Sequence, residues 1–288
     1  MRVYEFIWYF FAYGILGWCV EVMYATVVQK TFVNRGFLNG PICPIYGVGV
    51  AVVLLFLEPL RTNLLLLYIV GTVLVTVIEG ITGYVLDKLF HHKWWDYSNR
   101  PFNIGGYVCL LFSLIWGVAL VAIVLLIHPV IQKGVQLIPT TVGLVLLVLL
   151  TGALLADLYV TVAGILKLNK KLEAMEKIAA ELKVLSNKVG ESLSENVLDT
   201  LEVQKEGKKR LEDVQAEGRK KLEEMQLEGR KKLEDAQAEL RKRYQEMMDY
   251  RSKVGNRLLK AFPKMQSREH QSMLNELKEY ARNRKWHR

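Results

Sequence analysis

Long uninterrupted runs of apolar residues dominate the first part of the chain. A helix rises about 1.5 Å per residue, so roughly 20 apolar residues cross a hydrocarbon core of about 30 Å. The runs predict five membrane-spanning helices, near residues 3–28, 40–57, 63–87, 107–127 and 137–166. The second run is the shortest and opens with Pro41 and Pro44, so a partly re-entrant segment is its alternative. The first run is too long for a signal-peptide core and is expected to be retained.

After residue 166 the apolar runs give way to charged residues with an internal repeat. Four eleven-residue units cover residues 203–246, beginning with VQKEGKKRLED and ending with AQAELRKRYQE. Three helical turns per eleven residues is about 3.67 residues per turn, so the apolar positions form a narrow stripe on a nearly straight helix. The stripe positions that we expect to mediate self-association are Gly207, Leu211, Val214, Gly218, Leu222, Met225, Gly229 and Leu233.

The glycines of this stripe are unusual for a helix interior. Each costs about 1 kcal/mol relative to alanine, which is a disadvantage unless another backbone approaches closely there. The repeats therefore favour a homodimer formed through the stalk. A single solvated helix and a helix lying on a lipid surface are the alternatives.

These patterns predict an all-α protein, a polytopic membrane helix bundle followed by a long cytoplasmic coiled-coil-like stalk. We expect a membrane domain at 1–166, a helical stalk at 167–252 and a short helical segment at 253–288. Gly190 predicts a bend in the stalk. Because the arm before it is too short to pair with all that follows, we favour a stalk that runs outward over a hairpin.

The distribution of charge sets the orientation. The formal net charge of +9 arises almost entirely after residue 166. Basic residues flank the apolar runs mainly in the first and third loops and after the last run, which by the positive-inside rule are cytoplasmic. The chain is thus expected in the cell (inner) membrane, with its N-terminus outside and its tail in the cytoplasm. Acidic residues flank every basic cluster of the tail and no nucleic-acid motif is present, so we expect no nucleic-acid partner.

Known catalytic and metal-binding motifs are missing from the sequence. It contains no G-x-S-x-G, H-E-x-x-H or phosphate-binding G-x-x-x-x-G-K-[ST] motif. Its three cysteines have no disulfide or zinc spacing, and the adjacent His91 and His92 would point apart on a helix. We therefore expect no catalytic residue, metal or cofactor, although an enzyme is not excluded.

Three carboxylates lie away from the ends of the apolar runs, where an ionisable group is costly and usually faces a protein interior or a wet cavity. Glu21, Glu79 and Asp157 each precede the expected cytoplasmic end of their run by about 10 to 14 Å. The loops above them are polar. The candidate polar site comprises Glu21, Arg35, Asn34, Asn39, Glu79, Asp96, Asn103 and Asp157. The alternative is structural, with Glu21 and Glu79 pairing with Arg35 or Arg100, and Asp157 meeting the headgroup region.

Several short motifs resemble the bacterial integral-membrane family Putative ABC-transporter type IV. They are GW at 17–18, NRGFLNGP at 34–41, WWDYS at 94–98, PFN at 101–103, FSLIWG at 112–117 and HP at 128–129, over about residues 4–130. In one position, where the family usually has an arginine, this chain has Tyr107. The resemblance implies a permease. Without a phosphate-binding loop the chain needs a separate ATPase or an ion gradient.

The sequence thus favours the membrane component of a transport system that contacts the lipid bilayer, self-associates through its stalk and has a separate ATPase or cytoplasmic partner. Two alternatives remain: a membrane-embedded lipid-modifying enzyme, and a membrane-anchored coiled-coil scaffold.

The orientation is directly testable. A cysteine introduced at Lys133, in the loop expected outside, should react with a membrane-impermeant maleimide in intact cells. A tag fused after Arg288 should be cleaved by protease only in inverted vesicles. Labelling of position 133 only after lysis contradicts the predicted orientation.

Overall fold

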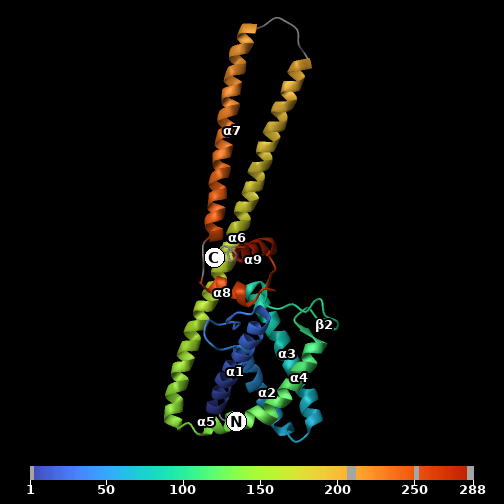
Figure 1. Cartoon of the computed structure of the whole chain (residues 1–288), viewed down its shortest axis with the longest axis vertical. Coiled ribbons are helices and arrows are strands. Elements are labelled where there is room, and N and C mark those ends of the chain that lie inside the picture. Colours follow the sequence, from blue (N-terminus) through green and yellow to red (C-terminus); the bar gives the residue numbers. More distant parts are fainter. Residues whose placement is uncertain (1–2, 206–211, 250–252, 284–288) are drawn as a thin grey trace. The chain divides into compact units, whose positions relative to one another are not determined.

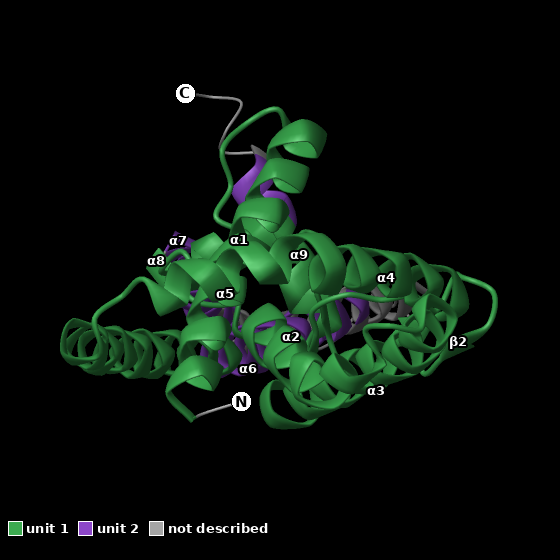
Figure 2. Cartoon of the chain, turned by 90° about the horizontal axis from the view of Figure 1, so that it is seen from below, with its two compact units in different colours: residues 1–169, 251–278 green, residues 170–250, 279–288 purple. Residues whose placement is uncertain are grey.

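The computed structural model describes residues 3–205, 212–249 and 253–283 (Figure 1). The chain divides into two compact units, coloured separately in Figure 2. Unit 1 comprises Met1–Asn169 and Arg251–Lys278, and unit 2 comprises Lys170–Tyr250 and Glu279–Arg288. The expected all-α class is confirmed, since helices form nearly all of the described structure.

Unit 1 is a bundle of apolar helices. In order they are α1 (Val3–Gln29), α2 (Pro44–Leu57), the 3-10 turn η1 (Glu58–Leu60), α3 (Leu64–Phe90), α4 (Leu110–Ala122), the π-helical turn η2 (Ile123–Ile127), α5 (His128–Gln136) and the first part of α6 (Thr140–Lys205). Among the described residues four helices are long and apolar enough to cross a membrane, namely Val3–Gln29, Leu64–Phe90, Leu110–Gln136 and Thr140–Lys188. The chain is therefore a membrane protein. Because Pro44–Leu60 is shorter, the count of five spans stays a prediction.

The sequence placed the end of the fourth apolar run near residue 127, but the helix that contains α4 continues through Pro129. A π-helical turn at Ile123–Ile127 leads directly into α5, whose first turn contains Pro129. Proline has no N–H and fits the first turn of a helix, and a wider π turn before it removes the clash with the preceding carbonyl. His128 is buried, with its Nδ1 3.1 Å from the Tyr13 hydroxyl, instead of closing the span.

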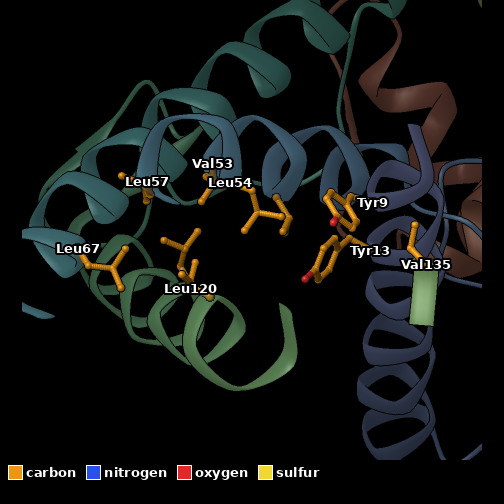
Figure 3. Close-up of a cluster of buried hydrophobic side chains, with 10 residues drawn as sticks. Tyr9, Tyr13, Val53, Leu54, Leu57, Leu67, Leu120 and Val135 are labelled. Atoms are coloured by element: carbon orange, nitrogen blue, oxygen red, sulfur yellow. The ribbon is translucent and has the colours of Figure 1, made fainter. Parts of the chain in front are cut away.

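One apolar cluster joins the ends of five helices of unit 1 (Figure 3). Tyr9 and Tyr13 come from α1, and Leu67, Leu120 and Val135 from α3, α4 and α5. The remaining members, Val50, Val53, Leu54, Leu57 and Val124, belong to α2 and η2. A hydrophobic effect between helices is weak in lipid, so the close packing of these side chains is what holds the helices together.

Small residues let α1 and α2 approach closely. A Cβ on Gly14 would lie 2.7 Å from Ile42 Cγ1, and a Cβ on Gly47 would collide with the backbone oxygen of Phe10. The loop between the helices, residues 30–43, therefore packs back along α1, and the Cys43 N–H donates to the Gly14 oxygen at 2.9 Å. Gly14 lies about 22 Å before the end of α1 at the rise of an α-helix. The loop thus turns inward along the bundle, and α2 starts well below the end of α1.

The C-terminal segment also belongs to unit 1. It contains α8 (Lys253–Ala261), β4 (Gln266–Ser267) and most of α9 (Gln271–Asn283). The strand β4 pairs antiparallel with β1 (His92–Lys93), and a second short pair joins β2 (Asn103–Ile104) to β3 (Val108–Cys109). The sequence predicted a stalk that runs outward to its end. Instead, the segment that follows the stalk, up to Lys278, belongs to unit 1.

Unit 2 contains the distal part of α6 and all of α7 (Glu212–Asp249). The bend expected at Gly190 is absent, since α6 runs without interruption through it to Lys205. The charge of Asp249 acts on Lys171, so the two ends of this unit lie near each other. Of the stripe, Gly207 and Leu211 lie outside the described residues. The backbone of Val214, Gly218, Leu222 and Met225 is helical.

The glycine contact between α1 and α2 generates a prediction. Gly47→Ala places a methyl group against the Phe10 carbonyl and should destabilise the protein by about 1–3 kcal/mol, because a backbone cannot move aside as a side chain does. Gly152→Ala is the matched control, since nothing lies within 4 Å of its added Cβ, and alanine is the better helix former by up to about 1 kcal/mol. Thermal unfolding in mild detergent measures both. Equal melting temperatures for the two variants contradict the close contact.

Candidate functional site

The loop at residues 30–43 is ordered by the side chain of Asn34. Asn34 Oδ1 accepts hydrogen bonds from Trp18 Nε1 at 2.7 Å and from the Gly36 N–H at 3.1 Å, and its Nδ2 donates to the Asn39 oxygen at 2.6 Å. Asparagine has one acceptor and two donors, so it can stand in for a backbone partner on both sides of a turn. Asn34 is therefore an organiser of the loop.

Asp157 of α6 binds the same loop. Its carboxylate accepts from the Asn39 N–H at 3.1 Å, from Asn39 Nδ2 at 2.7 Å and from the Gly40 N–H at 2.6 Å. Thr161 Oγ1 lies 3.0 Å from the same Asn39 amide. A carboxylate with several N–H donors is well stabilised in an apolar surrounding. Asp157 therefore holds the loop at residues 30–43.

Arg257 of α8 completes the hydrogen bonding of the loop. Its Nε donates to Asn39 Oδ1 at 2.9 Å, and its two terminal nitrogens donate to the backbone oxygens of Gly36 and Phe37 at 2.7 Å each. The guanidinium therefore uses its fork of donors on three acceptors of one loop. Sequence reasoning did not identify Arg257, because nothing local distinguishes it from the other basic residues of the tail.

Glu21 of α1 lies in an ion pair. Arg35 Nε is 3.2 Å from Glu21 Oε2, and the Tyr46 hydroxyl donates to Glu21 Oε1 at 2.6 Å. Arg35 also stacks over the Tyr24 ring at 4.6 Å. Both oxygens of this carboxylate have partners. The pairing with Arg35, one of the two structural alternatives, is therefore present.

The second polar loop, residues 91–109, is tied together mainly by its own side chains. Asp96 Oδ1 accepts from Ser98, and Asn103 donates from Nδ2 to the Arg100 oxygen at 2.7 Å and accepts from the Gly106 N–H at 3.2 Å. Gly106 has φ +76°. Partial burial opposes ionisation of Asp96, but the hydrogen bonds from Ser98 outweigh it and lower the pKa of Asp96. Asp96 and Asn103 thus shape the loop.

Glu79 of α3 is placed differently from the other carboxylates. Its Oε1 accepts from the Tyr97 hydroxyl at 3.3 Å, whereas its Oε2 is buried and has no hydrogen-bond partner among the described residues. Tyr97 stacks on Phe112. Burial raises the pKa of the Tyr97 phenol, and the negative charges of Glu79 and Glu21 raise it further. Glu21 and Glu79 therefore lie around one tyrosine, and of the two only Glu79 has an unused oxygen.

Asp87 of α3 is a buried carboxylate that the sequence analysis missed. Its side chain is 0% exposed, and Arg268 donates to its two oxygens from Nε at 2.7 Å and from a terminal nitrogen at 2.6 Å. The Tyr107 hydroxyl donates to Asp87 Oδ2 at 2.5 Å and lies 3.0 Å from Arg268. Its position in the last turn of α3 could have identified Asp87 from the sequence, because an acidic residue there is unfavourable without a cationic partner.

Tyr107 stands where the resemblance described above implies an arginine. In this chain a guanidinium is still present at that position, since Arg268 reaches it from the C-terminal segment. Burial raises the pKa of Tyr107, and its hydrogen bond to the Asp87 carboxylate raises it further.

The predicted polar site is therefore divided between two roles. Asn34, Asn39, Asp157 and Arg35 order the loop at 30–43, while Asp96 and Asn103 order the loop at 91–109. Glu79 lies beneath the second loop with one oxygen unused. Among the described residues, no group of three histidine, cysteine or acidic side chains gathers as a metal site.

Comparison with known proteins supports the resemblance and extends it. Residues 8–162, more than half of the 288 residues, match the family Putative ABC-transporter type IV. The match continues beyond residue 130, where the sequence motifs ended, and includes Asp157. No curated protein and no solved structure matches the chain. With the motifs and the residues of both polar loops inside the matched range, which covers more than half of the chain, the chain belongs to the Putative ABC-transporter type IV family.

Proposed function

We propose that this chain is the permease component of a transport system, with a cytoplasm-facing polar site centred on Glu79. The family and the four long apolar helices support a membrane protein related to transport. The position of Glu79 supports the site. It lies in α3 roughly 16 Å before the last residue of that helix, at the helical rise of about 1.5 Å per residue.

The observation that carries the proposal is the unused oxygen of Glu79. A buried polar atom without a partner costs about 1–3 kcal/mol, and charge on it costs more. Proteins retain such a group where it exchanges a proton or binds a passing cation or polar solute. Asp157 and Glu21 do not share this property, since donors or a counter-ion occupy both oxygens of each carboxylate.

The proposed transport needs an energy source other than ATP hydrolysis by this chain. Its sequence has no phosphate-binding loop, so transport by this permease requires a separate ATPase or an ion gradient. Extraction of the native protein in mild detergent separates the alternatives. A stoichiometric ATPase supports the permease, bound lipid supports a lipid-modifying enzyme, and a cytoplasmic assembly protein supports a scaffold.

The stalk is proposed to join two copies of the chain. Gly229 is exposed with nothing within 4 Å of an added Cβ, and Leu227 beside it is 69% exposed. Nearer the end of α7, the stripe residue Leu233 is half-buried. A helix gains from glycine only where a second backbone comes close. Because no described residue supplies such a backbone at Gly229, a second copy is the partner that we propose.

Glu79→Gln tests the proposed site. The amide keeps the volume and can still accept from Tyr97, but it carries no charge and does not titrate. We expect normal accumulation, an unchanged melting temperature and at least a tenfold loss of activity in complementation of a deletion strain. Tyr97→Phe should retain more activity, because it removes one hydrogen bond and leaves the carboxylate.

Two matched carboxylate-to-amide variants serve as controls. Asp157→Asn loses acceptors for charge-assisted hydrogen bonds and should destabilise the protein by about 1–3 kcal/mol. Glu21→Gln loses its ion pair with Arg35, which should also lower the melting temperature. Their activity should fall only as far as folded protein falls. Full activity of Glu79→Gln, or a loss that merely tracks protein level, removes the functional claim for Glu79.

Cross-linking tests the stalk. Cysteines at Gly229 should form disulfides between two copies more readily than cysteines at Lys231, because two residues along a helix turn the side chain to another face. We expect at least a fivefold difference under mild oxidation in native membranes. Equal yields at the two positions, or none, would favour a solvated helix or a lipid-surface helix.

A further inference from the structure

Residues 253–278, named here the C-terminal clamp, contact both polar loops of unit 1. Arg257 holds the loop at 30–43 through Asn39 and two backbone oxygens. Arg268 holds Asp87 and Tyr107. Between these two arginines, Phe262 packs edge-on against Trp94 with ring centroids 5.0 Å apart. The clamp therefore fixes two loops that are far apart in the sequence.

The clamp contacts the loop that contains Tyr97, the hydrogen-bond partner of Glu79. Tyr97 belongs to the loop at 91–109, and this loop meets the clamp at several points besides the contact of Trp94 with Phe262. They include the strand pairing of His92 with Ser267, the hydrogen bond from Gln266 Nε2 to Asp96 Oδ2 at 3.0 Å, and the contact of Arg268 with Tyr107. The backbone N–H of Tyr97 donates a hydrogen bond to the oxygen of Gly106, the residue before Tyr107. Tyr97 therefore cannot leave Glu79 freely while the clamp is docked.

We infer that the C-terminal clamp is an intramolecular lid, and that cytoplasmic access to Glu79 requires its release. This inference deepens the proposed function and rests on the Glu79 site. The two arginines are suited to such a lid because their acceptors are groups that water can satisfy. Backbone oxygens of Gly36 and Phe37 can be hydrated, and the Arg268 side chain is already 47% exposed. An aliphatic side chain in place of either arginine would have no hydrogen bonds for water to replace.

The clamp follows the stalk in the sequence. Unit 2 lies between Asn169, the last residue of the first part of unit 1, and Arg251, where unit 1 resumes, and the clamp begins at Lys253. Asn169 contacts the strand β1 and the end of α3. Its Oδ1 lies 2.7 Å from Nε2 of His92, which pairs with Ser267 of the clamp, and its Nδ2 donates to the Phe90 oxygen.

The experiment uses the full-length protein with Cys19, Cys43 and Cys109 replaced by alanine. Docking is measured by disulfide formation between Lys93→Cys and Gln266→Cys, which face each other across the β1–β4 pair. Access is measured separately as the rate at which Glu79→Cys reacts with a soluble maleimide in inverted vesicles. Each measurement is made with and without Arg257→Ala plus Arg268→Ala, and with Arg61→Ala plus Arg282→Ala as the control for charge.

We expect the clamp variant to lower disulfide yield at least fivefold and to raise labelling of position 79 at least tenfold, with the control pair changing neither. Unchanged disulfide yield overturns the role of the arginines. Lower yield with unchanged labelling overturns the lid and leaves a fixed attachment. Labelling of position 79 in the parent as fast as at an exposed Lys264→Cys overturns it as well.

If the double variant does not accumulate, Arg268→Lys replaces it, because lysine keeps the charge but loses the two-pronged contact with Asp87. The same expected changes apply, at a smaller size of about twofold to threefold. Failure of the lid and failure of the Glu79 site remain distinguishable. Labelling reports access whether or not the carboxylate functions, and activity of Glu79→Gln reports function whether or not the clamp moves.

Discussion

The inward-turning loop at residues 30–43 places a constraint on the rest of unit 1. Its backbone leaves N–H and C=O groups beside apolar helices, where an unsatisfied group is costly. Three side chains from three different elements satisfy them: Asn34 from the loop, Asp157 from α6 and Arg257 from α8. Together these side chains stabilise the loop packed along α1, with α2 starting near the level of Gly14. The helices, the loop and the tail are therefore interdependent.

The features that depend on local pattern were predictable from the sequence. Long apolar runs gave the helices because crossing hydrocarbon demands length and hydrophobicity and little else. The pairing of Glu21 with Arg35 was within reach for a similar reason, since a short segment separates the two residues. The all-helical class and the family followed from the same range of residues. In each case the deciding information lies within a few dozen residues.

The contacts that form the clamp were not predictable in this way. Arg257 and Asn39 are separated by 218 residues, and Arg268 and Asp87 by 181. No periodicity connects such positions, and a basic tail offers many arginines of equal appearance. The bend expected at Gly190 failed for a different reason. One glycine costs a helix only about 1 kcal/mol, which the remaining turns of a helix of 66 residues readily outweigh.

The three carboxylates expected in the candidate site from their depth, Glu21, Glu79 and Asp157, differ in the number of their partners. Asp157 has backbone and amide donors, Glu21 has an arginine and a tyrosine, and Glu79 has one tyrosine and a free oxygen. Their depth was the property visible in the sequence, and it made them look equivalent. Their partners come from the two polar loops and from α2, so only the fold distinguishes them. A carboxylate that is fully satisfied has little to gain from a proton or a solute, whereas one with an unused oxygen does.

The same reasoning applies to the arginines of the clamp. A guanidinium that satisfies buried backbone oxygens and a buried carboxylate stabilises the closed arrangement, and its own partial exposure keeps water available as a substitute. Closure and release can then differ by a small free energy even though many contacts change, because each lost hydrogen bond is replaced by one to water. Apolar contacts such as Phe262 with Trp94 have no such replacement. They favour the closed state, so any opening of the clamp has to offset the loss of these apolar contacts.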